Sequence, residues 1–316
     1  MEREEKAMEA KQAVNIRPHK KKMSREDKIF HTINYTVFFL LGLICVYPFY
    51  YLIINTISRN DYVDVGLVMY APVGIHFQNY VNIFKLSNVL NSVFISVLRT
   101  VLGTFIPLIF TTILGYLFTK EHMKGRKFLY RFTIITMYFS AGMIPVYMNI
   151  RMLGLLNNFW VYIIPSLIKV YNVVLVKTFI ESLPAALEES AQIDGANYFH
   201  RFVHIVFPLS TPILATIALF NAVGAWNSYL DTLLYITDSR LYTMQFQLYE
   251  YLNQAAALAK SLNNLTDLSM LDAATKVSTT AVRNTMTVIT IVPIICVYPF
   301  IQRYYVQGVM IGAVKG

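Results

Sequence analysis

Two histidines at helical spacing are the best candidates in this chain for direct metal chemistry. His200 and His204 are four residues apart, which places two imidazoles on one helix face at a zinc-ligand spacing. A metalloprotease HExxH motif needs Glu after the first His, whereas Arg201 stands there, and no third ligand is evident. We therefore interpret the pair as part of a polar helix face and expect no metal site.

Other catalytic motifs are missing from the sequence. It has no Gly-Lys dipeptide, so it lacks the GxxxxGK[ST] loop that holds nucleotide phosphates, and it has no G-x-S-x-G string of the serine hydrolases. Its two cysteines, Cys45 and Cys296, lie in apolar stretches and are read as small buried hydrophobes. We predict that the chain is not an enzyme and binds no cofactor itself.

A polar interruption of about thirty residues, from Glu181 to Pro212, lies between apolar runs. It predicts a helix after Pro184, a turn at Asp194-Gly195 and a second helix, because Gly adopts positive φ without steric penalty. The expected apolar faces are Leu183, Leu187 and Ala191 in the first helix, with Glu188, Glu189 and Gln192 turned elsewhere, and Phe199, Phe202, Val203 and Val206 in the second.

The elements around this loop have the composition of a membrane protein. Hydrophobic residues make up 56% of the chain and charged residues 14%, against about a quarter charged in soluble domains. We predict an all-α fold with six transmembrane helices, since six runs approach the 20 or so apolar residues that a bilayer requires. They are Phe30–Ile57, Val89–Phe118, Tyr130–Ile150, Phe159–Phe179, Pro212–Ile236 and Ala281–Ile301.

The positions of Lys and Arg predict the orientation. Basic residues gather before the first run and in the loop after the second, so both termini and the Glu181–Pro212 loop are expected in the cytoplasm. Residues 1–28 are predicted to be a tail, and residues 29–316 the transmembrane domain. The net charge of +9 could suggest nucleic acid, but these residues flank spans, where they meet anionic membrane lipid; we expect no nucleic-acid partner.

The polar loop also carries a family resemblance. Glu189-Ser190-Ala191, three residues and Gly195 resemble the EAA motif of permease subunits of bacterial ABC importers, with Ser190 in place of the first alanine. The segments Asp194-Gly195-Ala196 and Pro208-Leu209-Ser210-Thr211-Pro212 match the same pattern. Further pieces resemble the carbohydrate branch, on the maltose-permease side: residues 144–147, 153–155, 226–227 and 298–316. The similarity runs from about residue 30 to the C-terminus.

This resemblance implies the fold of a type I ABC importer permease in a bacterial cell membrane. It implies a second, homologous permease subunit, an extracytoplasmic solute-binding protein, and two ATPase subunits that bind ATP and Mg²⁺. The solute-binding protein would meet the outer loops, Asn60–Ser87 and Thr237–Thr280, the latter with a short helix at Gln254–Lys260. The residues implied in docking the ATPase are Glu188, Glu189, Ser190, Ala191, Asp194, Gly195 and Ala196.

Polar residues within the spans are the other candidates, because charges there are costly to insert. Trp226, Asn227, Tyr229 and Asp231 could form part of a sugar path, with the ring stacking on the sugar and the amide and carboxylate binding hydroxyls; alternatively they form an interhelical packing joint. Arg99 and Lys169 could extend their charged ends to the membrane surface, or they could line a water-filled path. Alternatives to a sugar importer are an importer of another small solute or a stand-alone secondary transporter, which broken helices with intramembrane charges would favour.

Overall fold

The computed structural model describes residues 24–85, 88–263 and 279–313, and these residues contain helices and loops but no strand. By their contacts the residues divide into two units, the first ending at Tyr51 and the second starting at Leu52. The first unit consists of most of α2 (Arg25–Thr56). The predicted tail, residues 1–28, lies largely outside the described residues, and its boundary stays a prediction.

A reciprocal cap starts α2. The Ser24 hydroxyl accepts a hydrogen bond from the Asp27 backbone N–H at 3.1 Å, and the Asp27 carboxylate accepts one from the Ser24 N–H at 3.0 Å. This arrangement satisfies two N–H groups that the first turn of a helix leaves free. The helix is long and apolar enough to cross a membrane, as predicted for the first run.

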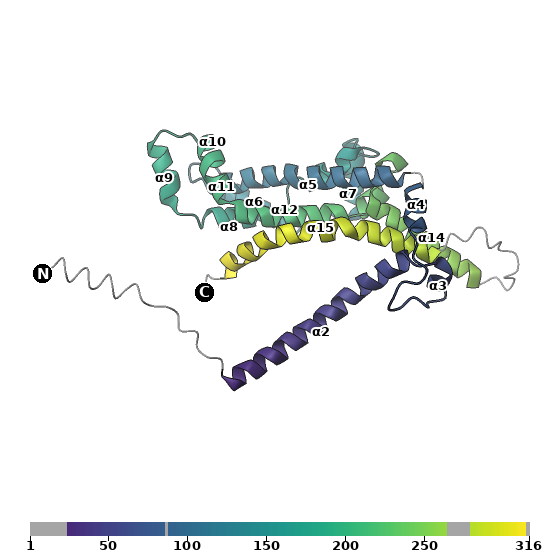
Figure 1. Ribbon diagram of the computed structural model, residues 1–316. Helices are drawn as coiled ribbons and strands as arrows, with labels where there is room; N and C mark the ends of the chain where they lie inside the picture. The colour runs from purple at the N-terminus through teal and green to yellow at the C-terminus, as the bar shows by residue number, and fades with distance from the viewer. Residues whose placement is uncertain (1–23, 86–87, 264–278, 314–316) are drawn as a thin grey trace. The chain divides into compact units, whose positions relative to one another are not determined.

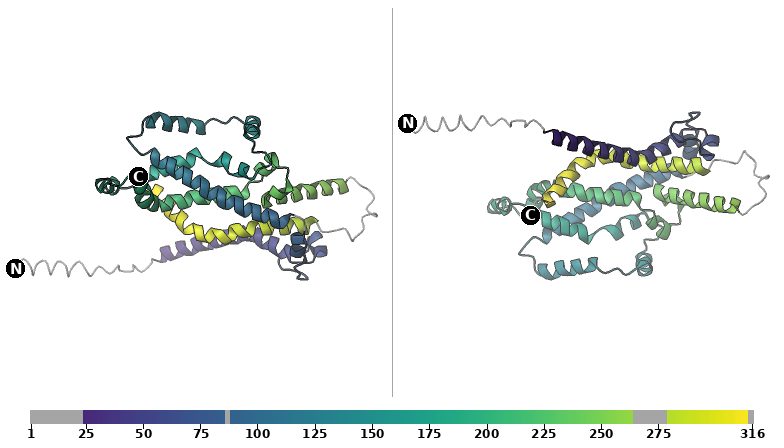
Figure 2. Two further views of the ribbon diagram at one scale, coloured as in Figure 1. Left: turned by 90° about the horizontal axis from the view of Figure 1, so that it is seen from above. Right: turned by 90° about the horizontal axis from the view of Figure 1, so that it is seen from below.

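The second unit is a set of long helices with shorter ones at each end (Figures 1 and 2). Its central helix, α5 (Val89–Leu117), packs against α12 (Thr211–Asn227) and α8 (Val170–Ile180). The C-terminal helix α15 (Thr279–Ala313) contacts α12 and α14 (Met244–Asn263). The predicted helix at Gln254–Lys260 therefore exists, as part of a longer one.

Short helices occupy the two ends of this unit. At one end lie α9 (Ala185–Ile193), α10 (Tyr198–Arg201) and α11 (Phe207–Leu209) (Figure 1). At the other lie α3 (Asn60–Asp64) and α4 (Gln78–Lys85), together with the longer α14. The predicted helix–turn–helix and the predicted outer loops are thus at opposite ends, as a membrane-crossing chain requires.

The predicted count of six single spans is not confirmed. In the part of the chain that the structure describes, three helices could cross a membrane by length and composition, in α2, α5 and α15; the number rises to five spans if each of two bent helix pairs counts as one. One bent pair joins residues 159–166, in two 3₁₀ turns, to α8 at 50°; the other joins residues 198–209 to α12 at 78°. The third predicted span falls on α6 (Arg126–Met137) and α7 (Met143–Met152), which Tyr138–Gly142 separates.

A glycine brings two of the long helices together near the α9 end. A Cβ at Gly115 of α5 would lie 2.7 Å from Cγ1 of Val176 in α8, closer than real Cβ contacts. Such small residues let membrane helices approach without a hydrophobic driving force. Around this contact a buried cluster joins α5, α8, residues 202–206 and α12, comprising Leu108, Tyr116, Val176, Ile180, Val206, Leu214 and Ile217.

Candidate functional site

The α9–α10 hairpin has the local geometry that its sequence predicts. α9 ends at Ile193, and Gly195 has φ of +84°, a conformation that favours glycine. A Cβ on Gly195 would meet nothing within 4 Å, so the turn is open on that side. The Asn197 side chain then caps α10 by accepting a hydrogen bond from the His200 N–H at 2.8 Å.

The second helix of the hairpin differs from its predicted register. Residues 202–206 form a π-helical turn. Such a turn contains more residues than an α-helical turn, so it rotates the preceding side chains about the helix axis. Val206 is buried as expected, but the Phe199 side chain is 75% exposed rather than part of the buried face. Ile193 is 86% exposed and Leu187 is also exposed, so the hairpin presents apolar side chains at its surface.

Glu188 holds α9 against the rest of the chain. Its carboxylate accepts hydrogen bonds from the Lys120 ammonium, just beyond α5, and from the Tyr116 hydroxyl at 2.8 Å, and it pairs with the Arg201 guanidinium at 3.7 Å. Arg201 also donates to the Gln192 side chain at 2.7 Å. Glu188 and Gln192 were predicted to lie off the apolar face of the first helix, and both contact Arg201 of α10. Glu189 is exposed.

The environment of Glu188 favours its charged form. Burial raises the pKa of this carboxyl, but hydrogen bonds from Lys120 and Tyr116 and the charges of Lys120 and Arg201 outweigh it, so the pKa is lowered overall. A folded pKa below the unfolded value stabilises the fold above the unfolded pKa, and this contribution disappears as the pH falls through the folded pKa. The attachment of α9 is therefore complete at neutral pH.

We predict that Glu188→Gln loosens α9 while Glu189→Gln does not. The first change leaves two partly buried cations, Lys120 and Arg201, without their shared carboxylate, and hydrogen bonds to charged groups are worth about 1.5–3 kcal/mol. Spin labels on α9 and at the end of α5 should show a broader distance distribution in the first variant. In the unsubstituted chain the same broadening should begin only below the usual glutamate pKa of about 4.3. Equal broadening in both variants at neutral pH would contradict the assignment.

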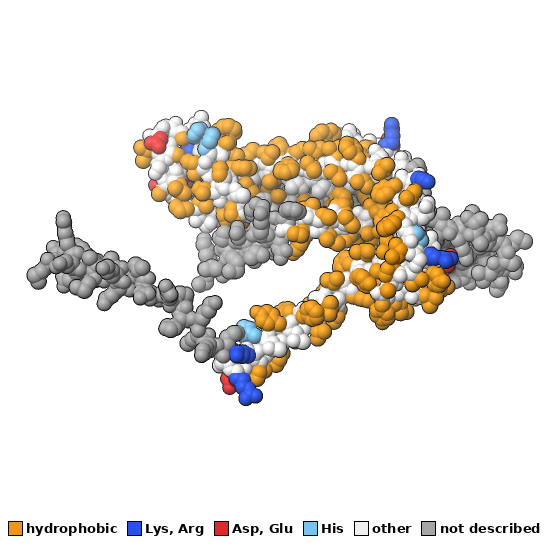
Figure 3. Space-filling view, in the orientation of Figure 1, with side chains coloured by type: hydrophobic (Ala, Val, Ile, Leu, Met, Phe, Trp, Pro, Cys, Tyr) orange, Lys and Arg blue, Asp and Glu red, His pale blue; other side chains and the backbone are white. Residues whose placement is uncertain are grey.

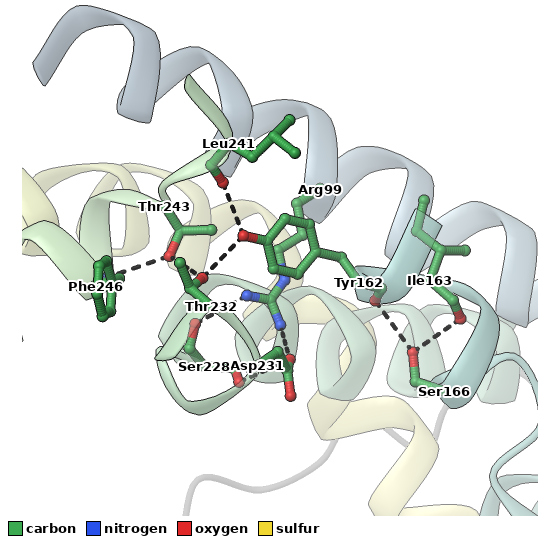
Figure 4. A network of polar contacts seen from close by, with 10 residues as sticks. All are labelled: Arg99, Tyr162, Ile163, Ser166, Ser228, Asp231, Thr232, Leu241, Thr243 and Phe246. Carbon is green, nitrogen blue, oxygen red and sulfur yellow. Dashed lines mark hydrogen bonds and ion pairs between the residues drawn. The ribbon is translucent and has the colours of Figure 1, made fainter. Parts of the chain in front are cut away.

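A second polar cluster lies where α5, α13 (Leu230–Tyr235) and the 3₁₀ turn Phe159–Tyr162 meet (Figure 4). The buried Arg99 guanidinium pairs with the Asp231 carboxylate and donates to the Ser228 carbonyl at 2.9 Å. It also lies over the Tyr162 ring, 4.5 Å from the centroid. Asp231, predicted for the sugar path, thus neutralises a buried arginine.

The Tyr162 hydroxyl extends this cluster toward α14. It donates to the Leu241 carbonyl at 2.7 Å and lies 3.0 Å from the Thr232 hydroxyl, which lies 3.1 Å from the Thr243 hydroxyl (Figure 4). The partners come from α13 and from residues 241–243 just before α14, so the cluster fixes how these two segments meet the turn that carries Tyr162. Nothing in the spacing of Tyr162 along the sequence marks it as a partner of Arg99.

Of the other residues predicted for the sugar path, Trp226 and Tyr229 pack against neighbouring helices and Asn227 is exposed. Trp226 is buried, and its indole N–H donates to the Thr290 carbonyl of α15 at 3.0 Å. This contact joins α12 to α15, as the alternative of an interhelical packing joint predicts. Beside it lies a recess of about 240 Å³ between α5, α12 and α15, lined almost wholly by apolar side chains, so it offers sugar hydroxyls few hydrogen-bond partners. Tyr229 stacks on Tyr249 with centroids 4.6 Å apart. Asn227 is exposed.

His200 and His204 stack on one another with ring centroids 4.1 Å apart. Among the described residues, no group of three His, Cys, Asp or Glu side chains could hold a metal ion. The two cysteines, predicted to be buried, are exposed in the isolated chain, because the surfaces of its spans are uncovered. On the face drawn in Figure 3, hydrophobic side chains cover the long helices, whereas charged and histidine side chains gather at the α9–α10 end, at the opposite end and at the start of α2.

Comparison with known proteins identifies the family to which this chain belongs. Residues 108–311, about two thirds of the chain, match the family described as binding-protein-dependent transport system inner membrane component. The chain belongs to this family of permeases. It is therefore a membrane component of an ABC importer, and its all-helical fold is that of the family's permeases.

Relatives of this permease include two Bacillus subtilis (strain 168) proteins. It is 32% identical to the polygalacturonan/rhamnogalacturonan transport system permease protein YtcP, covering 92% of this chain and 100% of that one, and 34% identical to protein LplC, covering 93% and 97%. Among solved structures, it is 30% identical to a chain of a bacterial ABC transporter that imports the acidic polysaccharide alginate. That match has a TM-score of 0.78 and covers 90% of this chain and 99% of the other.

Proposed function

We propose that this permease is one of two pore-forming subunits of an ATP-driven importer of sugars, oligosaccharides in particular. Its partners would be a homologous permease, two ATPase subunits that bind ATP and Mg²⁺, and an extracytoplasmic solute-binding protein. Its termini and the α9–α10 hairpin would face the cytoplasm, where basic residues flank the spans. Sugar as the cargo class follows from the relatives, whose names include polygalacturonan, arabinooligosaccharides and melibiose/raffinose/stachyose.

The observation that carries this proposal is the hairpin itself. It exposes Leu187, Ile193 and Phe199 beside an open turn at Gly195, and exposed apolar groups of this kind mark interaction sites. Behind this surface, Glu188 connects α9 to the end of α5. Closure of an ATPase against the hairpin would therefore pull on a membrane-crossing helix. Of the two glutamates considered for docking, the exposed Glu189 is the better candidate, since Glu188 is occupied.

The alternative of a stand-alone secondary transporter has one feature in its favour. Broken helices with an intramembrane charge are typical of such transporters, and the bend between residues 159–166 and α8 has Lys169 beside it. The hairpin would then have no role. We therefore retain the importer, in which a broken helix can equally line a substrate path.

Copurification tests this proposal. The tagged chain, extracted from its native membrane in mild detergent, should bring an ATPase, a second permease and a binding lipoprotein, as identified by mass spectrometry. Reconstituted in proteoliposomes, the complex should hydrolyse ATP faster when the binding protein carries an oligosaccharide. If the chain purifies alone or only with itself, the ATP-driven function is wrong.

A further inference from the structure

Lys169 stands at the break in a membrane-crossing segment. It directly precedes α8, whose axis is bent by 50° from the 3₁₀ turns before it. The 11 residues of α8 span about 16 Å and lead to the α9 hairpin, so Lys169 lies roughly halfway across a hydrocarbon layer of about 30 Å. Asn221, about ten residues into α12 from the same end, lies at a similar depth.

The surroundings of Lys169 give its ammonium no ion pair, although the charge of Asp231 acts on it. Its ammonium donates to the Asn221 side-chain oxygen at 3.3 Å, and that oxygen also accepts from Asn172 at 3.3 Å. Within the described parts of the chain, no carboxylate lies within ion-pair distance of Lys169, whereas the other cation at the span interior, Arg99, is paired with Asp231. Lys169 and Arg99 share the single carboxylate of Asp231, so these three groups together keep one net positive charge.

Lys169 is also accessible. Its side chain is exposed in the isolated chain, and its ammonium lies beside the exposed Gly224 of α12, where a Cβ would be 3.9 Å away. A lysine at mid-depth is too far from either interface to snorkel, and intramembrane charges face a protein interior or a water-filled cavity rather than lipid. This face of α8 and α12 must therefore line water or meet an anion.

Two further features suit an anion at this place. The free N–H groups of the first turn of α8 and its helix dipole favour negative charge beside Lys169. The side-chain nitrogen of Asn221, although Asn221 is only 2% exposed, has no hydrogen-bond partner among the described residues. A buried amide donor without a partner is costly, so an acceptor is expected to approach it when the site is filled.

We propose that Lys169, with Asn221 and the first turn of α8, forms a carboxylate-binding site in the substrate path, and that the cargo is therefore an acidic oligosaccharide containing uronate units. This inference rests on the proposed importer function. A neutral sugar offers only hydroxyls, which would leave the ammonium uncompensated in the membrane. A uronate carboxylate neutralises it and forms a charge-assisted hydrogen bond.

The test uses the complete importer in proteoliposomes with its binding protein. Short oligogalacturonates and alginate oligosaccharides are supplied alongside the same sugars after reduction of their carboxylates to hydroxymethyl groups. Uptake is compared between the unsubstituted importer, Lys169→Met and Lys169→Arg. We expect Lys169→Met to lower uptake of the acidic sugar by about tenfold or more, as for loss of one hydrogen bond to a charged group, and Lys169→Arg to retain most of it.

A second readout does not depend on uptake. In a variant with Cys45 and Cys296 replaced, Lys169→Cys should react with a membrane-impermeant thiol reagent, and the acidic oligosaccharide should slow that reaction more than its reduced counterpart. The carboxylate site would be overturned if Lys169→Met left uptake unchanged. It would also be overturned if Lys169→Met lowered uptake of the acidic and the reduced sugar equally, which would indicate that Lys169 pairs with a carboxylate of the partner permease. Efficient uptake of neutral sugars alone would also overturn it. A chain that copurifies with no ATPase refutes the importer function instead.

Discussion

Gly195→Arg is expected to abolish sugar uptake while the chain still inserts in the membrane. At φ of +84°, a side chain strains the turn by only about 1–2 kcal/mol, and it meets no atom within 4 Å. The arginine would instead project from the tip of the α9–α10 hairpin, into the space that a docked ATPase would fill. Uptake and ATPase copurification are measured against the amount of chain in the membrane.

Gly125→Arg is a matched control for this variant. Gly125 also has positive φ, +74°, with no atom within 4 Å of a Cβ, and its loop is predicted on the same membrane face. The added charge is therefore equal and the backbone strain similar, so the main difference is the position. Retained uptake in Gly125→Arg and loss in Gly195→Arg would localise the effect to the hairpin. Normal uptake in Gly195→Arg would refute docking there.

The hairpin could be predicted from the sequence because its signals are local. Pro184, Gly195 and the capping Asn197 set the helix boundaries through backbone conformations that depend on neighbouring residues. The π turn at residues 202–206 has no comparable signal, and so the exposure of Phe199 could not be foreseen. The break at Tyr138–Gly142 was likewise hidden, because apolar composition continues through it.

Partners that are distant in sequence were beyond prediction. Glu188 pairs with Lys120, 68 residues away, and Arg99 with Asp231, 132 residues away. Amphipathic patterns show which side of a helix is apolar, but a carboxylate on the other side can face water or a neighbouring helix. Arg99 and Asp231 were each recognisable as charges inside a span, which made a partner necessary, yet only packing selects which one.

Asp231→Ala is expected to destabilise the permease by about 1.5–3 kcal/mol, the worth of hydrogen bonds to a charged group, because Arg99 is buried whereas Asp231 itself is 37% exposed. The reason lies in Arg99, whose side chain is 3% exposed and which would keep its charge without a counter-ion. In detergent, the variant should show a much lower midpoint of thermal unfolding. Uptake should fall with the loss of folded complex at growth temperature.

Asp238→Ala is the matched control for this effect. The Asp231 and Asp238 side chains are similarly exposed, at 37% and 30%, and each pairs with an arginine, but Arg240 is 82% exposed. Exposed ion pairs contribute little to stability, so this variant should unfold almost as the unsubstituted chain does. If both variants unfold alike, burial of the arginine does not set the cost. A further variant, with Arg99 replaced by Met in the Asp231→Ala background, separates two causes of the destabilisation. It should recover stability if the cause is the uncompensated charge of Arg99, and not if the cause is lost packing.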